Sequence, residues 1–384
     1  MNLHLPAEQT TIFEEMSLLA RQHDAINLGQ GFPDRDGPAE IRQAAADAIM
    51  AGPNQYPPMR GLPLLREAVA THYAQHQGLG ITAENVLITS GATEALAASI
   101  LSLIEPGDKV VMIEPMYDAY LPLVRQAGGV PHFITLRPPE WRLDAETLDR
   151  VIDPTTKAIV FNNPLNPAGR AFTREELSLL ADVCIRNDVI VISDEVWEHI
   201  VFDGRTHVPL HGLPGMAERT IKIGSAGKIF SLTGWKVGFA IAPPPLLAAM
   251  TRMHQYLTFS TPPALQIGTA HGLTMSPSYF TGMREGFARS RDTLAKSLTA
   301  EGLTVLPSEG TYFLCIDLSA SGIDMDDRSF CLKMVQEAGV AMIPLSPFYA
   351  SQKEDRIVRL CFAKADELLI EAALRLGQGI MRLS

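Results

Sequence analysis

Short apolar runs rich in β-branched residues alternate with helical patterns through the middle of this chain, and this alternation restricts the possible folds more than any other feature. The runs lie at 86–89, 110–113, 158–161, 189–192 and 220–223. Helical patterns separate them, at 93–104, at about 117–126 and from Thr173, where Thr-Arg-Glu-Glu forms a capping box. Buried strands separated by helices are typical of a mainly parallel sheet covered on both faces. The sequence therefore predicts an α/β domain.

The pattern changes after Pro243, where strands and helices no longer alternate strictly. A long helical stretch at about 277–301 is followed by strand-like 312–318, a helix near 328–338, strand-like 356–362 and a last helix from Ala365. This mixture is typical of an α+β lobe, which we expect the N-terminal residues to join. We divide the chain into an N-terminal arm with part of the small domain (1–44), a large domain (45–275) and a small C-terminal domain (276–384).

Composition and charge argue against several classes of function. The net charge of -11 and the lack of a basic run disfavour nucleic acid and anionic membranes as partners. The cysteines, at 184, 315, 331 and 361, are far apart in apolar segments, which is typical of reduced core thiols. We therefore expect neither a disulfide framework nor a metal site. The N-terminal residues lack a secretory pattern and no apolar run is long enough to cross a bilayer, so we expect a cytoplasmic protein.

The stretch SAGKIFSLTGWK, which begins at Ser225, carries the most functional information. It places Lys228 in a turn of small residues, near hydroxyls and the second cation Lys236. A desolvated lysine beside another positive charge has a lowered pKa, so its amine can attack a carbonyl. Ser225 and Lys236 suit a phosphate. These residues indicate a Schiff-base lysine that holds a phosphorylated aldehyde cofactor, with a solvated surface lysine in a glycine turn as the alternative.

Two further motifs lie where predicted strands end. The motif SGATEAL begins a helix with Gly91, Ala92 and Thr93, whose backbone N–H groups and helix dipole suit an anion. A simple capped helix start is the alternative there. Asp194, in SDEVW, follows a buried strand, at the edge where open parallel sheets bind ligands. Its carboxylate requires a cation such as a protonated pyridine nitrogen, unless it only caps a turn.

Other residues suit substrate or ring recognition. Asn166 lies between prolines in NNPLNPAGR, which suits a hydrogen bond to a ligand but is also ordinary turn sequence. Arg359, in the apolar RIVRLCF, requires an anion such as a substrate carboxylate, or else a structural ion pair or an edge position. The segment INLGQGFPD, with Gly31, indicates close approach of the backbone to a ligand. Tyr56 and Tyr117 are candidates for ring or phosphate contacts, with surface packing as the alternative.

Together, and in this order, the motifs resemble the class I/II pyridoxal-phosphate aminotransferases of fold type I. The resemblance spans nearly the whole chain and looks closest to the branch of kynurenine/glutamine and methionine aminotransferases. It is carried by NLGQGFPD, QYPPMRGLPLLREA, SGATEAL, EPMYDAY, NPLNPAGR, SDEVW, SAGKIFSLTGWKVG, GTYF and VRLCFAK. It implies a large domain with a mainly parallel sheet, a smaller α+β domain, pyridoxal 5′-phosphate as cofactor, and ping-pong transfer of an amino group from an L-amino acid to a 2-oxo acid.

The resemblance also implies a role for each cofactor-binding residue. Lys228 would form the Schiff base and later move the proton between substrate and cofactor, and Asp194 would pair with the pyridinium nitrogen. Tyr117 would stack on the ring, and Asn166 would bond the ring oxygen. The phosphate would be held by Gly91, Ala92, Thr93, Ser225 and Lys236, with Tyr56 contributed by the neighbouring subunit of a homodimer.

On the substrate side, the resemblance implies that Arg359 clamps the α-carboxylate with help from Asn166 and the Gly31 backbone. Aspartate-type relatives use an additional arginine for a side-chain carboxylate, and the corresponding segment 256–261 has none. This favours an amino donor with a neutral side chain, such as a thioether or an aromatic ring. Whether Arg60 reaches the substrate is open at this point.

Trp197 departs from the family pattern, which usually has tyrosine after Ser-Asp-Glu-Val. An indole donates one hydrogen bond but neither accepts nor titrates, so its contact with the cofactor must differ from that of a phenol. Lys236 stands where many relatives have arginine, as in the kynurenine-type branch.

Two other functions share this fold and its lysine. A carbon–sulfur β-lyase dependent on pyridoxal phosphate is the main alternative. A regulatory domain that binds the cofactor is a weaker one, because the sequence begins with residues that match the family's N-terminal arm and we expect no DNA-binding helix module before them.

Overall fold

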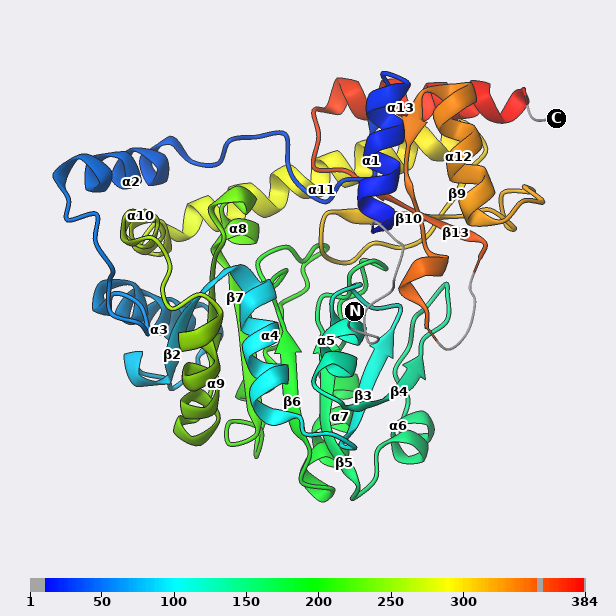
Figure 1. Ribbon diagram of the computed structural model, residues 1–384. Coiled ribbons are helices and arrows are strands. Elements are labelled where there is room, and N and C mark those ends of the chain that lie inside the picture. Colours follow the sequence, from blue (N-terminus) through cyan, green and yellow to red (C-terminus); the bar gives the residue numbers. More distant parts are fainter. Residues whose placement is uncertain (1–10, 351–354, 383–384) are drawn as a thin grey trace.

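The computed structural model describes residues 11–350 and 355–382, so the first part of the expected N-terminal arm lies outside the described residues. Its largest element is a seven-stranded sheet in the order β2-β8-β7-β6-β5-β3-β4 (Figure 1). The strands are β2 (Val86–Ser90), β3 (Lys109–Glu114), β4 (Val130–Thr135), β5 (Thr156–Asn162), β6 (Ile190–Asp194), β7 (Thr220–Ser225) and β8 (Val237–Ile241). Only β8 runs antiparallel to its neighbours in this sheet. The predicted α/β fold with a mainly parallel sheet is confirmed.

Helices cover this sheet and complete its core. Helix α4 packs on β7 and β8 and against α9, while α3 packs on β2 and against α10. The helices of this part are α2 (Ala39–Ala51), α3 (Pro63–Gln77), α4 (Gly91–Leu103), α5 (Tyr120–Gln126), α6 (Ala145–Val151), α7 (Arg174–Arg186), α8 (Ala226–Ile229), α9 (Pro244–Leu257) and α10 (Pro263–Leu273). Helix α7 begins with the predicted capping box, in which Thr173 and Glu176 bond each other's backbone N–H groups. Aliphatic and aromatic side chains form the core between these layers, and polar and charged side chains such as Lys222 and Glu195 are buried with them.

A second, antiparallel sheet lies beside the first, in the order β12-β13-β10-β9 (Figure 1). Its elements are β9 (Thr304–Val305), β10 (Phe313–Asp317), β12 (Ile343–Pro344) and β13 (Ile357–Cys361), with α1 (Ile12–Gln22), α11 (Pro277–Ala300), α12 (Asp327–Ala338) and α13 (Asp366–Met381) packed around it. The N-terminal β1 (Ile26–Asn27) pairs in parallel with β11 (Val340–Ala341). The boundaries 1–44, 45–275 and 276–384 stay a prediction.

Strand β4 and helix α6 are among the elements that the sequence analysis missed. Strand β4 lies at the edge of the sheet and alternates exposed and partly buried residues, so it lacks the continuous apolar run of a buried strand. Helix α6 has a single buried residue, Leu148, and therefore shows little helical periodicity.

The topology gathers polar residues at one edge of the large sheet. Asn162, Asp194 and Ser225 are the last residues of the parallel strands β5, β6 and β7, and Ser90 is the last residue of β2. The carboxyl ends of parallel strands face the same side, which is where ligands bind in open α/β sheets. Among the described helices, none is both long and apolar enough to pass through a membrane.

Candidate active site

A cavity of about 240 Å³ opens at this edge of the sheet. Its walls contain predicted site residues from several separate segments: Gly91, Ala92, Thr93, Tyr117, Asn166, Asp194, Trp197, Ser225, Lys228 and Lys236. The other lining residues are Leu96, Tyr120, Asn162, Val196, Gly227 and Thr233, which the sequence analysis did not assign. The fold thus brings into one cavity almost the whole set of cofactor-binding candidates. Their individual roles remain predictions.

Lys228 lies on the short helix α8, directly after β7, and its side chain points into the cavity. Its Nζ is 3.2 Å from the hydroxyl of Tyr312 and 4.7 Å from the centre of the Trp197 ring. Burial lowers the pKa of Lys228 to about 8, and the positive charges of Arg359 and Lys236 act in the same direction. A solvated surface lysine is excluded by this position.

Asp194 is buried and provides a negative charge inside the cavity. Its carboxylate accepts a hydrogen bond of 2.7 Å from the hydroxyl of Tyr120 and one of 3.3 Å from the backbone N–H of Val196. The second bond is the turn cap that the sequence allowed, but the side chain also lines the cavity. Burial raises the pKa of Asp194 to about 6, because the charged form has lost solvent without gaining a directly bonded cation. A cationic ligand atom would restore the ionised state.

The part of the cavity wall that is formed by the start of α4, Lys236 and Ser225 is suited to an anion. Ser90 makes no side-chain bond that caps α4, so its hydroxyl does not compete for the first N–H groups of the helix. Gly91 has φ +76°, and a Cβ at this position would lie 3.1 Å from Nζ of Lys236. The positive φ favours glycine here, and the absence of a Cβ leaves room for this ammonium beside the helix start. Ser225 adds a hydroxyl from the end of β7.

Arg359 reaches the site from the second sheet. It lies on β13, which is bordered by β10 and β12, and its residue is 1% exposed. Its Nη1 donates to Oδ1 of Asn166 and its Nη2 to the carbonyl of Gly29, both at 2.9 Å, while Nε has no hydrogen-bond partner within the described residues. The position is not at an edge, and no ion pair of Arg359 is found among those residues. The guanidinium is therefore a buried cation that still has capacity for an anion.

The remaining candidates lie outside the cavity wall. The carbonyl of Gly31 accepts a hydrogen bond of 2.5 Å from Tyr312, whose hydroxyl also contacts Lys228. Tyr56 is 84% exposed and packs edge-to-face on Phe259, so it does not contribute to the cavity of its own chain. Arg60 binds the carboxylate and the carbonyl of Glu84 at 2.9 and 2.6 Å, which directs it away from the cavity.

Comparison with known proteins identifies the family of this chain. Residues 23–376 match the family described as aminotransferase class I and II. The chain belongs to this family. A solved structure of the N-succinyldiaminopimelate aminotransferase of Mycobacterium tuberculosis has a TM-score of 0.95 to it and 43% sequence identity, covering 98% of this chain and 99% of that one. The methionine aminotransferase of Escherichia coli is 40% identical over 97% of both chains, and human kynurenine–oxoglutarate transaminase 1 is 38% identical over 93% of both.

These relatives confirm the predicted branch of class I and II aminotransferases, and its fold type I architecture. Members of the family use pyridoxal 5′-phosphate, as the sequence analysis inferred. The cavity fits this group in three respects. Asp194 has no directly bonded cation among the described residues, the start of α4 with Lys236 provides an anion site, and Lys228 lines the same cavity. A pyridine nitrogen, a phosphate and an aldehyde require these three groups.

Two tyrosines next to the predicted residues were missed. Tyr120 bonds Asp194, and Tyr312 bonds both Lys228 and the Gly31 carbonyl. Nothing in the spacing distinguishes these phenols from core aromatics, and both are indeed fully buried. Tyr312 entered the sequence analysis in the strand-like segment 312–318 and in the motif GTYF, without a role of its own.

Proposed function

We propose that this aminotransferase prefers L-amino acids with neutral side chains, thioether or aromatic, as amino donors. The observation that carries the proposal is the surroundings of Arg359. The rings of Phe313, Phe13 and Phe348 lie 3.9, 5.2 and 5.5 Å from its guanidinium carbon. Aromatic walls of this kind favour an apolar substrate side chain over a charged one.

The charges near Arg359 support the same donor class. The described lining of the cavity includes the cations Lys228 and Lys236 but no arginine, and Arg60 is directed to Glu84. Asp118 adds a carboxylate close enough for its pKa to respond to Arg359, although burial is the larger effect and raises that pKa. A carboxylate on the side chain of the amino donor would therefore meet the negative charge of Asp118 and no arginine to pair with.

The proposed roles of the chain's own groups follow from their positions. Asp194 would hold the ring nitrogen protonated, the start of α4 with Ser225 and Lys236 would bind the phosphate, and Asn166 would bond the ring oxygen. The bound cofactor supplies an electron sink for the bond that is broken at the substrate Cα. Lys228, whose amine is neutral near pH 8, would take the proton from Cα and deliver it to the cofactor side.

Tyr312 and Trp197 would orient this lysine. The Tyr312 hydroxyl donates to Gly31, so its oxygen is left to accept from Nζ of Lys228. The Trp197 ring lies perpendicular to the Tyr312 ring, with centroids 4.4 Å apart, and beneath Nζ. Trp197 would therefore offer the face of its ring to the ammonium of Lys228. The tyrosine that is usual at this position would instead offer a hydroxyl to the cofactor.

A panel of amino donors with a 2-oxo acid acceptor tests the proposal. We expect methionine, phenylalanine and glutamine to be used with higher kcat/KM than aspartate. A clear preference for aspartate, or for the N-succinyldiaminopimelate named for the mycobacterial relative, would show the proposed donor class to be wrong. Release of pyruvate and ammonia from cystathionine without any 2-oxo acid would instead support the carbon–sulfur β-lyase.

We further propose a homodimer in which Tyr56 completes the site of the partner subunit. The described surface near Tyr56 has several exposed large apolar side chains: Ile49, Met50, Tyr256, Leu257 and Phe259. Such a patch is typical of a surface that another protein covers. Glu94, in the first turn of α4, connects this helix to the apolar patch. Its carboxylate accepts hydrogen bonds from His254 at 2.5 Å and from Thr258 at 2.6 Å, next to Tyr256 and Leu257 of the patch.

Sedimentation analysis of the wild-type protein and of Tyr256→Asp tests this assembly. We expect a dimer for the wild type and, because a buried charge is costly, dissociation of the variant with loss of activity. Lys296→Asp, on an exposed face of α11, is the matched control and should remain dimeric. A fully active wild-type monomer would contradict the proposal.

The setting we propose is the cytoplasm, consistent with four free, buried cysteines.

A further inference from the structure

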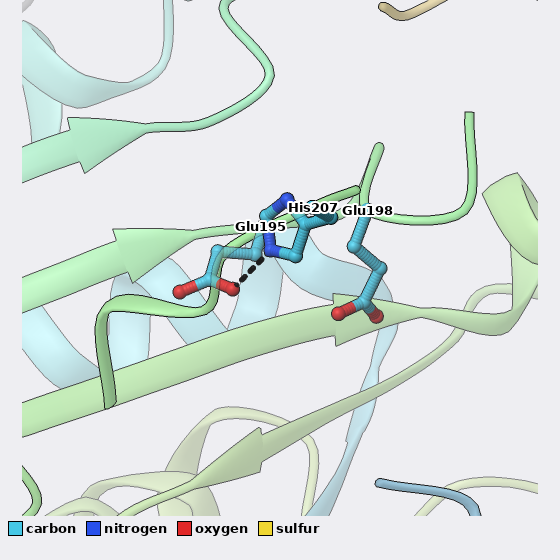
Figure 2. A group of neighbouring side chains, drawn as sticks. All are labelled: Glu195, Glu198 and His207. Atoms are coloured by element: carbon cyan, nitrogen blue, oxygen red, sulfur yellow. Dashed lines mark hydrogen bonds and ion pairs between the residues drawn. The ribbon is translucent and has the colours of Figure 1, made fainter. Parts of the chain in front are cut away.

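A buried cluster of charges lies beneath the turn that follows β6. Glu195, Glu198 and His207 place their ligand atoms within 4.8 Å of one another, and Figure 2 shows the His207–Glu195 contact, which is 2.7 Å long. This donor set is one that divalent metals use. However, Nζ of Lys222 lies 2.5 Å from Glu195 and 2.6 Å from Glu198. The positive charge that the two carboxylates require is thus provided by the chain itself.

The three charged groups Lys222, Glu195 and Glu198 are buried and have many hydrogen-bond partners. The side chains of Lys222, Glu195 and Glu198 are at most 1% exposed. Glu195 also accepts from the hydroxyl of Ser193 and the N–H of Leu210, and Glu198 from Tyr73 and Gln77 of α3. Burial alone would lower the pKa of Lys222, but the two carboxylates raise it above its ordinary value. The lysine therefore stays charged, and each carboxylate has a compensating partner.

The cluster is placed next to the cofactor-binding residues in sequence and in space. Glu195 directly follows Asp194, and Glu198 directly follows Trp197, within a turn closed by the bond from the Glu198 N–H to the Glu195 carbonyl. Lys222 lies on β7, the strand that leads to Ser225 and Lys228. Its ammonium therefore joins the turn after β6 to the strand that carries the reactive lysine.

We infer that Lys222 is a positioning residue: through Glu195 and Glu198 its ammonium holds the turn that presents Asp194 and Trp197 to the cofactor. Neither carboxylate of the cluster lines the cavity, whereas their neighbours in sequence, Asp194, Val196 and Trp197, do. An ion-paired anchor on the far side of a short turn restricts the rotation of the residues on the near side, as outer partners do for ligands of bound groups. The inference rests on the proposed cofactor site.

The test compares the stability of the apoprotein with its affinity for pyridoxal 5′-phosphate. We expect Lys222→Met to lower the apoprotein melting temperature and to weaken cofactor binding roughly tenfold to a hundredfold, the range reported for outer partners of metal ligands. Removing one carboxylate as well, in Lys222→Met with Glu198→Gln, should recover part of the apoprotein stability, because one of the two buried carboxylates that lose the shared ammonium is then neutral. Cofactor affinity should stay weakened, because the anchor is still missing.

If the double variant recovers both stability and cofactor affinity, the cluster is only structural. The same conclusion follows if Lys222→Met alone melts at a lower temperature but binds the cofactor normally. Glu198→Gln alone retains the Lys222–Glu195 pair and keeps the test decisive if Lys222→Met does not fold; normal affinity in this variant would overturn the inference. Lys109→Met, on β3 of the same sheet, is the matched control and should leave affinity unchanged. If Asp194→Asn also binds the cofactor with normal affinity, the proposed cofactor site is wrong. If Asp194→Asn binds it weakly while the variants of the cluster bind it normally, only the inference about Lys222 is contradicted.

Discussion

Lys228→Ala should change the absorption spectrum of the cofactor-loaded protein to that of a cofactor without a covalent bond to the chain, and lower turnover by at least about 10³-fold. A positioned proton-transfer group contributes roughly 10²–10⁴-fold by itself, and the variant also loses covalent attachment of the cofactor. The phosphate and ring contacts of the cavity remain, so we expect the variant still to bind pyridoxal 5′-phosphate without a covalent bond. Absorption spectra and single-turnover rates with a good donor measure these effects.

The pH dependence of cofactor capture gives a second measure of the same lysine. The pKa of Lys228 is lowered to about 8, so the neutral amine is scarce below this pH and predominates above it. The rate at which apoprotein captures the cofactor should therefore rise with pH and level off above about 8. Lys296→Ala, an exposed lysine of α11, should behave as wild type. Normal turnover by Lys228→Ala would show that another group performs the proposed chemistry.

Arg359→Ala should chiefly impair substrate binding. Loss of one partner from a buried, hydrogen-bonded charge pair costs about 2–5 kcal/mol, which corresponds to a fall of roughly 30- to 4,000-fold in kcat/KM for an amino donor. The effect should appear mainly in KM, because the α-carboxylate is bound in the ground state as well as in the transition state. Steady-state kinetics with methionine and its 2-oxo acid measure both halves of the reaction.

The spectrum of the loaded Arg359→Ala protein distinguishes a substrate role from a general defect. Arg359 does not line the cofactor cavity, so we expect the variant still to bind the cofactor and to absorb in the visible range. Loss of its positive charge should raise the pKa of Lys228 and shift the pH dependence of that absorption. Arg359→Lys keeps the charge but loses the planar pair of donors, and should lie between alanine and wild type. Arg356→Lys, just before the same strand, is the matched control. Unchanged KM in both Arg359 variants would contradict the proposed carboxylate clamp.

The sequence was sufficient to predict the parallel sheet and the site candidates that lie at strand ends. Asp194 and Ser225 follow apolar strand segments, and a parallel sheet brings such ends to one edge. Arg359 was found because a guanidinium in an apolar strand requires a partner. The same argument applies to Lys222, which interrupts the apolar run 220–223, and it would have led to the buried cluster had it been applied there.

Other features depend on tertiary contacts that no local pattern contains. Tyr120 and Tyr312 have the burial of core aromatics, and only the fold shows that their hydroxyls meet Asp194 and Lys228. The distance between Arg60 and the cavity depends likewise on its bonds to Glu84, which are formed across the surface. The edge strand β4 was missed because its exposed residues remove the apolar run that marks the inner strands.

The hydrogen bond between Asn166 and Arg359 connects a loop of the large sheet to a strand of the small one. The residues proposed to hold the cofactor belong to the large sheet, whereas the proposed carboxylate clamp belongs to the other. Absorption of the bound cofactor is therefore mainly a reporter of the large sheet, with Tyr312 as the contact of Lys228 from the other lobe. The spectral change on adding a donor reports the contact between the two. Followed together during denaturant unfolding, these signals separate loosening of the small lobe from loss of the whole fold.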